Sequence, residues 1–157
     1  MRPRALASPA VIQVAAGLVF RGPRMLITQR RQHDHLGGLW EFPGGKREAG
    51  ETFAACLARE LREELDIEVR VGRLFETIRH DYPDKRVLLK FYICEWLGNE
   101  PRALGCARFA WVGPAELGHY EFPAADAKLL TRLIRGEWGA PAEKPGAEKR
   151  EKRKSGE

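Results

Sequence analysis

Apolar residues occur along the chain in short runs, and each run is bounded by residues that favour turns. Runs of this length that are rich in Val, Ile and Phe predict β-strands. Residues 11–20 are apolar at almost every position, which predicts a strand buried on both faces. Residues 25–30 read as a returning hairpin strand. Further strands are predicted over residues 40–42, 69–71, 74–78, 87–96 and 109–112, with a turn at residues 81–84.

Two segments have the residue types and spacing of helices. Residues 51–65 contain only helix-tolerant residues, and Glu51 and Thr52 suit a helix start. Residues 125–135 place apolar side chains at helical spacing before Gly136, which predicts the end of that helix. Strands and helices alternate along the chain, so the pattern predicts an α/β (α+β) fold.

The first helix breaks the amphipathic rule. With Phe53 set at zero and about 100° per residue, Glu64 falls at roughly 20° and Glu60 at roughly 340°. Both carboxylates therefore lie beside the apolar stripe that Leu57, Leu61 and Leu65 form. Like charges four residues apart repel each other, and partial burial increases the cost. A divalent cation would explain the cluster, and so would a solvated acidic face with Arg59 and Arg62 as partners.

The segment before this helix favours the cation. Pro43-Gly44-Gly45 lets the backbone approach a ligand closely, because glycine carries no side chain. Only a handful of residues separate these glycines from the glutamate-rich helix. Backbone carbonyl oxygens together with carboxylates are the ligands that hard cations such as Mg²⁺ take.

The residues from Gly45 to Ile67 read GKREAGE, seven further residues, and then RELREELDI. This run resembles the Nudix box, G-x5-E-x7-R-E-U-x-E-E-x-G-U, in which U is a bulky aliphatic residue. Every specified position matches except the second glycine, which is Asp66 here. That position ends the helix, and aspartate adopts the left-handed conformation at some cost, so the departure is interpreted as structural.

The resemblance extends over about residues 10–135 and is closest to the MutT subgroup. The segments that carry it outside the box are Gln29-Arg30-Arg31, Gly38 to Lys46, Tyr82-Pro83-Asp84 and Phe122 to Asp126. The subgroup hydrolyses oxidised purine nucleoside triphosphates such as 8-oxo-dGTP, leaving a monophosphate and pyrophosphate. The resemblance therefore implies a Nudix-like mixed β-sheet sandwiched between α-helices, with Mg²⁺ as cofactor and Mn²⁺ as a substitute.

The resemblance also implies roles for individual residues. The metal ligands would be the Gly44 carbonyl and the carboxylates of Glu60, Glu63 and Glu64, with Glu60 the first choice for general base. Arg59 would orient the glutamates, and Glu51 would order an outer-shell water or cap the loop. The implied substrate-binding residues are Arg30, His35, Glu41, Phe42, Pro43, Gly44, Tyr82 and Asp126. For His35 a plain surface role remains open, and Asp126 could instead be a helix-start residue.

Two departures from the subgroup bear on mechanism. Its members commonly carry an acidic residue in the loop before the last strand, whereas residues 101–115 contain no Asp or Glu and Gly105 or a neighbour stands at that place. Either the box glutamates suffice, or Glu100 or Glu116 substitutes. The second departure is Asp126, which stands where the closest members have an asparagine that reads the base.

Composition excludes several classes of protein. The net charge of +5 is mostly terminal, because Arg2, Arg4 and the last fifteen residues supply +4 of it, so no stable nucleic-acid complex is expected. No apolar run has a membrane-spanning length, and three cysteines without paired spacing predict neither disulfides nor a zinc site. A single cytoplasmic domain over residues 8–138, monomeric or homodimeric, is expected, with flexible tails at residues 1–7 and 139–157.

Three functional hypotheses follow. The first is an 8-oxo-dGTP diphosphatase that sanitises the nucleotide pool. The second keeps the chemistry on another substrate, such as CTP or a nucleoside diphosphate derivative. The third is a non-catalytic Nudix module that binds a nucleotide or nucleic acid. The intact box disfavours the third hypothesis, because a pure binder has no need for all its glutamates.

Overall fold

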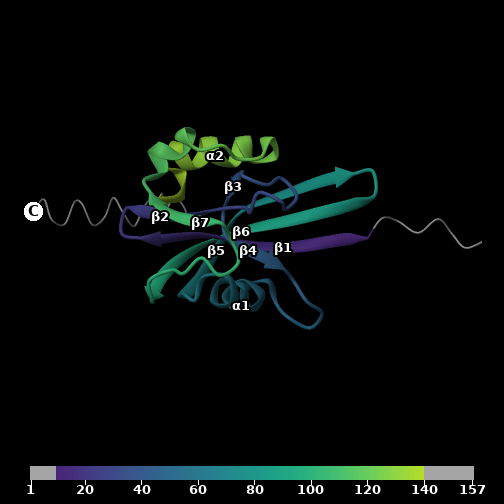
Figure 1. Ribbon diagram of the computed structural model, residues 1–157, viewed down its shortest axis with the longest axis horizontal. Helices are drawn as coiled ribbons and strands as arrows, with labels where there is room; N and C mark the ends of the chain where they lie inside the picture. The colour runs from purple at the N-terminus through teal and green to yellow at the C-terminus, as the bar shows by residue number, and fades with distance from the viewer. Residues whose placement is uncertain (1–9, 140–157) are drawn as a thin grey trace, which may run out of the picture.

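The computed structural model describes residues 10–139, which form a seven-stranded mixed sheet with helices on both faces (Figure 1). The strands are β1 (Val11–Arg21), β2 (Arg24–Gln29), β3 (Trp40–Glu41), β4 (Gly44–Lys46), β5 (Glu68–Tyr82), β6 (Lys85–Gly98) and β7 (Arg108–Val112). The helices are α1 (Phe53–Leu65) and α2 (Ala127–Ile134), with 3₁₀-helices η1 (Pro114–His119), η2 (Ala124–Asp126) and η3 (Glu137–Gly139). The predicted α+β sandwich is confirmed.

Strand β1 lies at the centre of the sheet, whose order is β3-β2-β1-β6-β5. It pairs in parallel with β6 over ten residues, from Val11 to Phe20. On its other side β1 pairs with β4 near its start and with β2 at its end. Neighbours on both edges and helices on both faces explain why residues 11–20 are so apolar.

Alternate residues of β1 contribute to two hydrophobic cores. Leu18 faces α2 and packs in a cluster with Phe91 and Leu129. Val19 faces α1 and packs in a second cluster with Leu57 and Leu61. The period of two along the strand therefore joins both helical layers to one sheet.

Helix α1 begins and ends with side-chain and backbone caps that its sequence predicted. Thr52 Oγ1 accepts a hydrogen bond of 3.0 Å from the Ala55 amide. Asp66 ends the helix in the left-handed conformation with φ 60°, and Asn99 donates to its carbonyl oxygen at 3.0 Å. The aspartate thus takes the conformation of the glycine it replaces in the motif.

Three predicted boundaries were wrong. Gly44–Lys46, predicted as part of a loop, is a strand paired with β1. The predicted strands at residues 69–71 and 74–78 are one strand, β5, because register shifts absorb the residues between them. Helix α2 starts two residues late, since Ala124–Asp126 forms a 3₁₀ turn first. Pattern alone does not detect bulges or two-residue pairings.

No helix within residues 10–139 is long and apolar enough to cross a membrane. The three cysteines, Cys56, Cys94 and Cys106, are free and buried. The predicted tails, residues 1–7 and 139–157, lie outside the described residues except for Gly139.

Candidate active site

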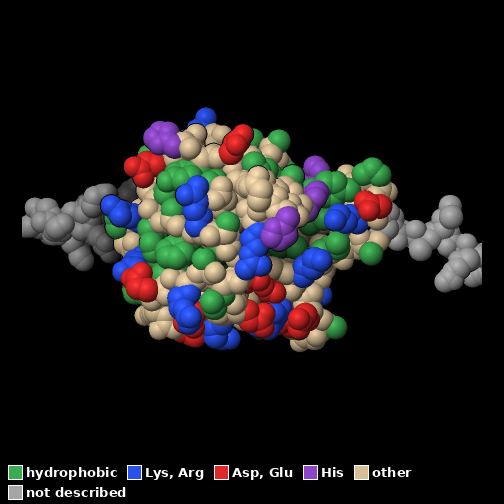
Figure 2. Space-filling model, in the orientation of Figure 1, with side chains coloured by type: hydrophobic (Ala, Val, Ile, Leu, Met, Phe, Trp, Pro, Cys, Tyr) green, Lys and Arg blue, Asp and Glu red, His purple; other side chains and the backbone are tan. Residues whose placement is uncertain are grey.

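The acidic face of α1 is organised by Arg59. Its guanidinium binds both carboxylate oxygens of Glu51, with Nε–Oε2 at 2.7 Å and Nη2–Oε1 at 2.9 Å. Nη1 binds Glu60 at 3.0 Å and Glu63 at 3.2 Å. Figure 2 shows acidic and basic side chains mixed over α1, at the lower edge of the view. Arg62, the other predicted partner, instead pairs with Glu68 at 3.1 Å.

Glu51 closes the segment between β4 and α1. Its Oε1 accepts a hydrogen bond of 2.9 Å from the Glu48 amide while Arg59 binds the same carboxylate. These bonds, that from Arg59 foremost, lower the pKa of Glu51 to about 2. The pair of Glu51 and Arg59 therefore fixes the helix start against the glycine-containing strand. This agrees with the predicted capping role of Glu51.

Glu60 and Glu64 are half-buried beside the apolar stripe, as the helical phase predicted, whereas Glu63 is exposed. Burial raises the pKa of Glu60, against the opposing effect of Arg59. Burial also raises the pKa of Glu64, and the charges of Glu60 and Glu41 raise it further. Both carboxylates are thus held where their negative charge is unfavourable, which is the arrangement that a bound cation stabilises.

Each of these two carboxylates lies on a glycine. A Cβ atom at Gly45 would come well inside 3.0 Å of the Glu60 carboxylate, and one at Gly105 would do the same with Glu64. Gly44 is equally crowded, but by the backbone of Ala15 in β1. A side chain at Gly44 would therefore overlap backbone, whereas one at Gly45 or Gly105 would displace a glutamate carboxylate.

The predicted metal ligands do not converge fully. Within residues 10–139, no three Asp, Glu, His or Cys side chains already surround one point. Arg59 holds Glu60 and Glu63, while Glu64 turns toward Gly105. The donor set still fits Mg²⁺, because that ion takes oxygen ligands and keeps several waters, so it does not need a complete protein cage.

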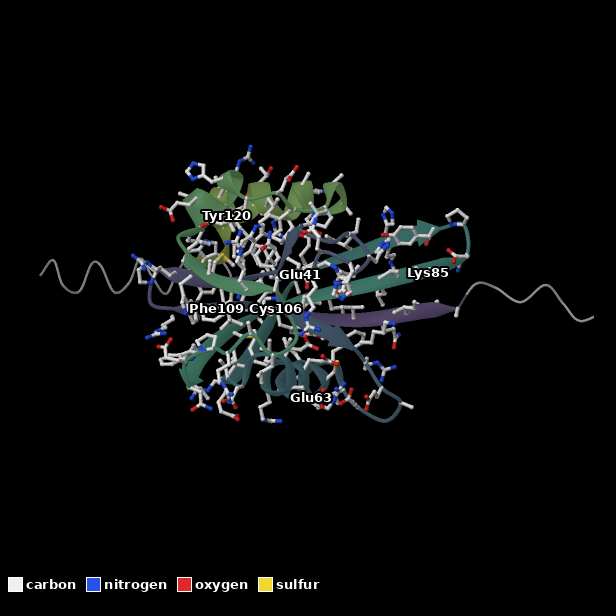
Figure 3. All side chains as sticks on the ribbon, viewed as in Figure 1. Glu41, Glu63, Lys85, Cys106, Phe109 and Tyr120 are labelled. Atoms are coloured by element: carbon white, nitrogen blue, oxygen red, sulfur yellow. The ribbon has the colours of Figure 1, made fainter. Side chains whose placement is uncertain are left out.

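A cavity of about 350 Å³ opens between the sheet and the segments that precede β3 and α2. Its floor is apolar, and Ile78, Val87 and Leu89 belong to it together with residues of β1. Gly44 and Gly45 line its wall, so the cavity adjoins the acidic face of α1. Figure 3 shows Glu41 near the middle of the molecule and Lys85 toward the tip of the β5–β6 hairpin, and both line the cavity.

Arg30, Glu41 and His35 are linked at the cavity wall. Arg30 Nη1 binds Glu41 Oε1 at 3.1 Å, and its Nε donates to the His35 carbonyl oxygen at 2.6 Å. Burial raises the pKa of Glu41, although Arg30 opposes the shift. The His35 ring lies edge-on to Tyr82 with centroids 6.5 Å apart, which places it on the cavity rather than on a remote surface.

Asp126 lies at the same cavity with 8% of its surface exposed. Its side chain makes no capping hydrogen bond to α2. Burial, with a further contribution from Glu41, raises the pKa of Asp126 to about 6. A residue that served only to start the helix would be expected to cap its amides, so this geometry favours a role in the cavity.

Two more predicted substrate residues differ in their surroundings. Phe42 lines the cavity and stacks on Phe122 with centroids 5.1 Å apart. Pro43 is buried outside the cavity lining, and its carbonyl accepts a hydrogen bond of 2.7 Å from the Gly17 amide. The structure thus gives Pro43 a role in holding β4 against β1.

Sequence reasoning missed His80 and Lys85, which line the far end of the cavity. The His80 and Tyr82 rings lie 4.4 Å apart, and Lys85 Nζ lies 5.6 Å from the Tyr82 centroid. The sequence contains a pattern that could have identified them, because His80 and Tyr82 lie two and four residues after Ile78 and so share its face of β5. That pattern indicates a site only once β5 and β6 are known to pair as one hairpin.

The two predicted substitutes for a loop acid are wrong. Glu100 is exposed and pairs with Arg21 at 2.9 Å. Glu116 accepts a hydrogen bond of 3.1 Å from the Gly113 amide at the start of η1. Neither lines the cavity. The box glutamates, Glu41 and Asp126 are therefore the carboxylates that the structure places at the acidic face and the cavity.

Replacing Arg59 with lysine tests its role as the organiser of the acidic face. Lysine keeps the charge but lacks the planar fork that binds Glu51 at two points. We expect kcat for nucleotide hydrolysis to fall about tenfold, as for other residues that orient ligands, with little change in KM. Arg62→Lys is the matched control on the same helix, and equal effects of both substitutions would contradict the role.

Comparisons with known proteins identify the family of the chain. The family model described as NUDIX domain matches residues 15–132. A Haemophilus influenzae 8-oxo-dGTP diphosphatase is 39% identical over 126 residues, which is 79% of this chain and 92% of that protein. The Escherichia coli CTP pyrophosphohydrolase is 31% identical over 133 residues, covering 85% and 98%. The solution structure of the E. coli ORF135 protein superposes with TM-score 0.74 at 31% identity, covering 85% and 96%. With its box glutamates, first box glycine and central arginine in place, and with the family model matching residues 15–132, the chain belongs to the Nudix family.

Proposed function

We propose that this protein is a Mg²⁺-dependent nucleoside triphosphate pyrophosphohydrolase whose preferred substrate is 8-oxo-dGTP. The observation that carries the proposal is the pair of half-buried carboxylates, Glu60 and Glu64, beside a glycine-walled cavity of about 350 Å³. The similarity to the H. influenzae 8-oxo-dGTP diphosphatase supports the choice of substrate. Water would attack phosphorus, the bridging P–O bond would break, and the products would be the monophosphate and pyrophosphate.

The proposed metal ligands are the Gly44 carbonyl and the carboxylates of Glu60, Glu63 and Glu64. Mg²⁺ bound there, or Mn²⁺ in its place, supplies charge neutralisation of the phosphates and aligns a water for in-line attack. Glu60 and Glu63 reach the position by releasing bonds of 3.0 and 3.2 Å to Arg59, which keeps Glu51 as its principal partner.

We assign proton transfer to Glu60. Burial raises the pKa of its carboxyl, which improves its strength as a base for the attacking water. After Arg59 Nη1 releases the carboxylate, one Glu60 oxygen would bind the metal and the other would accept the water proton. Arg30 would exchange its contact with Glu41 for the substrate phosphates, to which a guanidinium binds at two points.

The base and sugar would occupy the cavity. Its apolar floor and the Phe42 ring provide the flat contacts that a base requires, and Asp126 provides hydrogen bonding. An ionised Asp126 accepts two hydrogen bonds, which suits N1–H and the exocyclic amine of a guanine. His35 and Tyr82 would close the open side of the cavity.

CTP is the second candidate substrate. The pKa of Asp126, about 6, supports it, because the neutral acid is then populated near that pH. A neutral carboxyl group offers one donor and one acceptor, which suits N3 and the exocyclic amine of cytosine. The similarity to the E. coli CTP pyrophosphohydrolase agrees with this alternative.

The test is a pyrophosphate-release assay with 8-oxo-dGTP, dGTP, CTP and dCTP, with Mg²⁺ and with EDTA. We expect the highest kcat/KM for 8-oxo-dGTP and none with EDTA. A higher kcat/KM for CTP would replace the substrate but keep the chemistry. Tight nucleotide binding without turnover of any substrate would favour a non-catalytic module.

We also propose that residues 8–138 suffice for activity. The residues proposed for the site lie between Arg30 and Asp126, and the family match ends at residue 132. Residues 140–157 contain few apolar side chains and carry a small net charge. Deleting residues 141–157 should leave kcat/KM within about twofold of the full chain, because a polar segment of small net charge contributes little to catalysis. A loss of about tenfold would place the segment in the site.

A further inference from the structure

The loop between β6 and β7 is fastened to the end of α1. Two successive amides, those of Leu104 and Gly105, each donate to the Glu64 carbonyl oxygen at 3.1 Å. The Arg102 amide donates to the Leu65 carbonyl at 2.9 Å. From the other side, Arg31 Nη2 donates to the Leu104 carbonyl at 2.8 Å. Gly105 is therefore held against the last turn of the helix that carries the box glutamates.

A side chain at position 105 would conflict with its neighbours in space, and not with its own backbone conformation. Gly105 is not among the residues with positive φ, so its backbone is open to any amino acid. A Cβ atom there would nevertheless overlap the Glu64 carboxylate, with even the farther oxygen, Oε2, at 2.9 Å. The three nearest atoms all belong to the Glu64 carboxylate. The space that a side chain at residue 105 would need is therefore occupied by that carboxylate.

The Glu60 carboxylate likewise occupies the space that a side chain at Gly45 would need. The two carboxylates are four residues apart on one helix face, yet each lies on a different glycine, one in β4 and one in the β6–β7 loop. Two like charges free to move would separate into solvent. Because Glu60 packs on Gly45 and Glu64 packs on Gly105, the two carboxylates stay half-buried and separate. Both therefore remain available to bind one cation.

We propose that Gly105 is a positioning residue. Because it has no side chain, the Glu64 carboxylate can occupy the position from which it acts. This inference rests on the proposed function. In this chain Glu64 occupies the space of a loop side chain, so the carboxylate at the loop comes from α1. The loop at residue 105 thus provides space for a box glutamate instead of an acid of its own.

Gly105→Ala separates positioning from folding. The methyl group would meet the far end of a flexible side chain, so the backbone can stay while the Glu64 carboxylate turns away. We expect kcat to fall about tenfold or more, KM for the nucleotide to change little, and the melting temperature without metal to stay near that of the wild type. Mn²⁺ affinity of the nucleotide-free protein, measured by electron paramagnetic resonance, should weaken by a similar factor. Gly98→Ala is the matched control, because nothing lies within 4 Å of a Cβ there.

A double-mutant cycle distinguishes action through Glu64 from a general loop effect. If Gly105 acts through Glu64, then Gly105→Ala should not weaken Mn²⁺ binding further in the Glu64→Gln background. Independent, additive losses would overturn the inference, and so would wild-type Mn²⁺ affinity and kcat in Gly105→Ala. If the wild type neither binds Mn²⁺ nor hydrolyses any triphosphate, the proposed function itself fails. An active wild type with an unaffected Gly105→Ala rejects only the role of Gly105.

Discussion

Glu64→Gln is expected to lower kcat by about 100-fold or more, because it removes one proposed metal ligand and with it about 3 kcal/mol of transition-state stabilisation. The amide fills the same space beside Gly105, so the fold should remain intact. An unchanged kcat at saturating Mg²⁺ would remove Glu64 from the site and weaken the assignment of the whole acidic face.

The same substitution should leave the metal-free protein as stable as the wild type or more stable. Burial and the charges of Glu60 and Glu41 raise the pKa of Glu64 in the folded state. The folded protein therefore binds this proton more tightly than the unfolded chain, and stability falls as pH rises above the ordinary pKa of the carboxyl group. Glu64→Gln removes this loss, so its advantage in melting temperature should be present near pH 7 and disappear near pH 3.

Glu68→Gln is the control for both effects. Glu68, the first residue of β5, pairs with Arg62 of α1 at 3.1 Å, but half of its side chain is exposed and it does not line the cavity. A solvated pair of this kind contributes little to stability. We expect near wild-type kcat and melting temperature, which would show that the position of Glu64, and not the loss of any nearby negative charge, determines the result.

The sequence predicted the parts of this site that follow from local rules. Helical phase placed Glu60 and Glu64 beside the core stripe, and burial in the structure agrees. The left-handed conformation of Asp66 was likewise expected from its place at the helix end. Such properties depend on a few neighbouring residues, so one chain without homologues is enough to predict them.

Properties that depend on distant segments were not predicted. Glu100 and Glu116 are the acids nearest in sequence to the loop. In the structure Glu100 pairs with Arg21 and Glu116 accepts a hydrogen bond from the Gly113 amide. Conversely, the sequence marked Gly105 only as standing where an acid is missing, and its contact with Glu64 depends on how the loop lies against the end of α1. In both cases the role of the residue depends on contacts with segments that are distant in sequence. A local sequence pattern does not predict such contacts.

Asp126→Asn should raise stability at neutral pH and change which base is preferred. The pKa of Asp126 is about 6 in the folded protein, above its ordinary value of 3.8. The folded state therefore binds the proton more tightly, and stability is lost as pH rises through this interval, by roughly 3 kcal/mol at most. Asparagine does not ionise, so its advantage should be full above pH 6 and absent near pH 3, as measured by denaturation at each pH.

The same titration should separate the two candidate substrates. Above pH 6 Asp126 is ionised and accepts from the N1–H and amine of a guanine, whereas below it the neutral acid also donates and suits cytosine. The ratio of kcat/KM for 8-oxo-dGTP to that for CTP should therefore rise through pH 6. Effects of pH on Glu60 or on metal binding act on both substrates and cancel in the ratio.

Asparagine donates and accepts at every pH, so this rise should vanish in Asp126→Asn. Asp126→Ala should lower kcat/KM for the preferred base by about 10–100-fold more than for the other, because polar groups of that base lose their partner. Glu41→Gln is the necessary control, since Glu41 also has a raised pKa and contributes to that of Asp126. If the rise persists in Asp126→Asn and vanishes in Glu41→Gln, then Glu41 reads the base. Equal, small losses for both bases in Asp126→Ala, with a flat ratio in the wild type, would leave Asp126 without a role in selectivity.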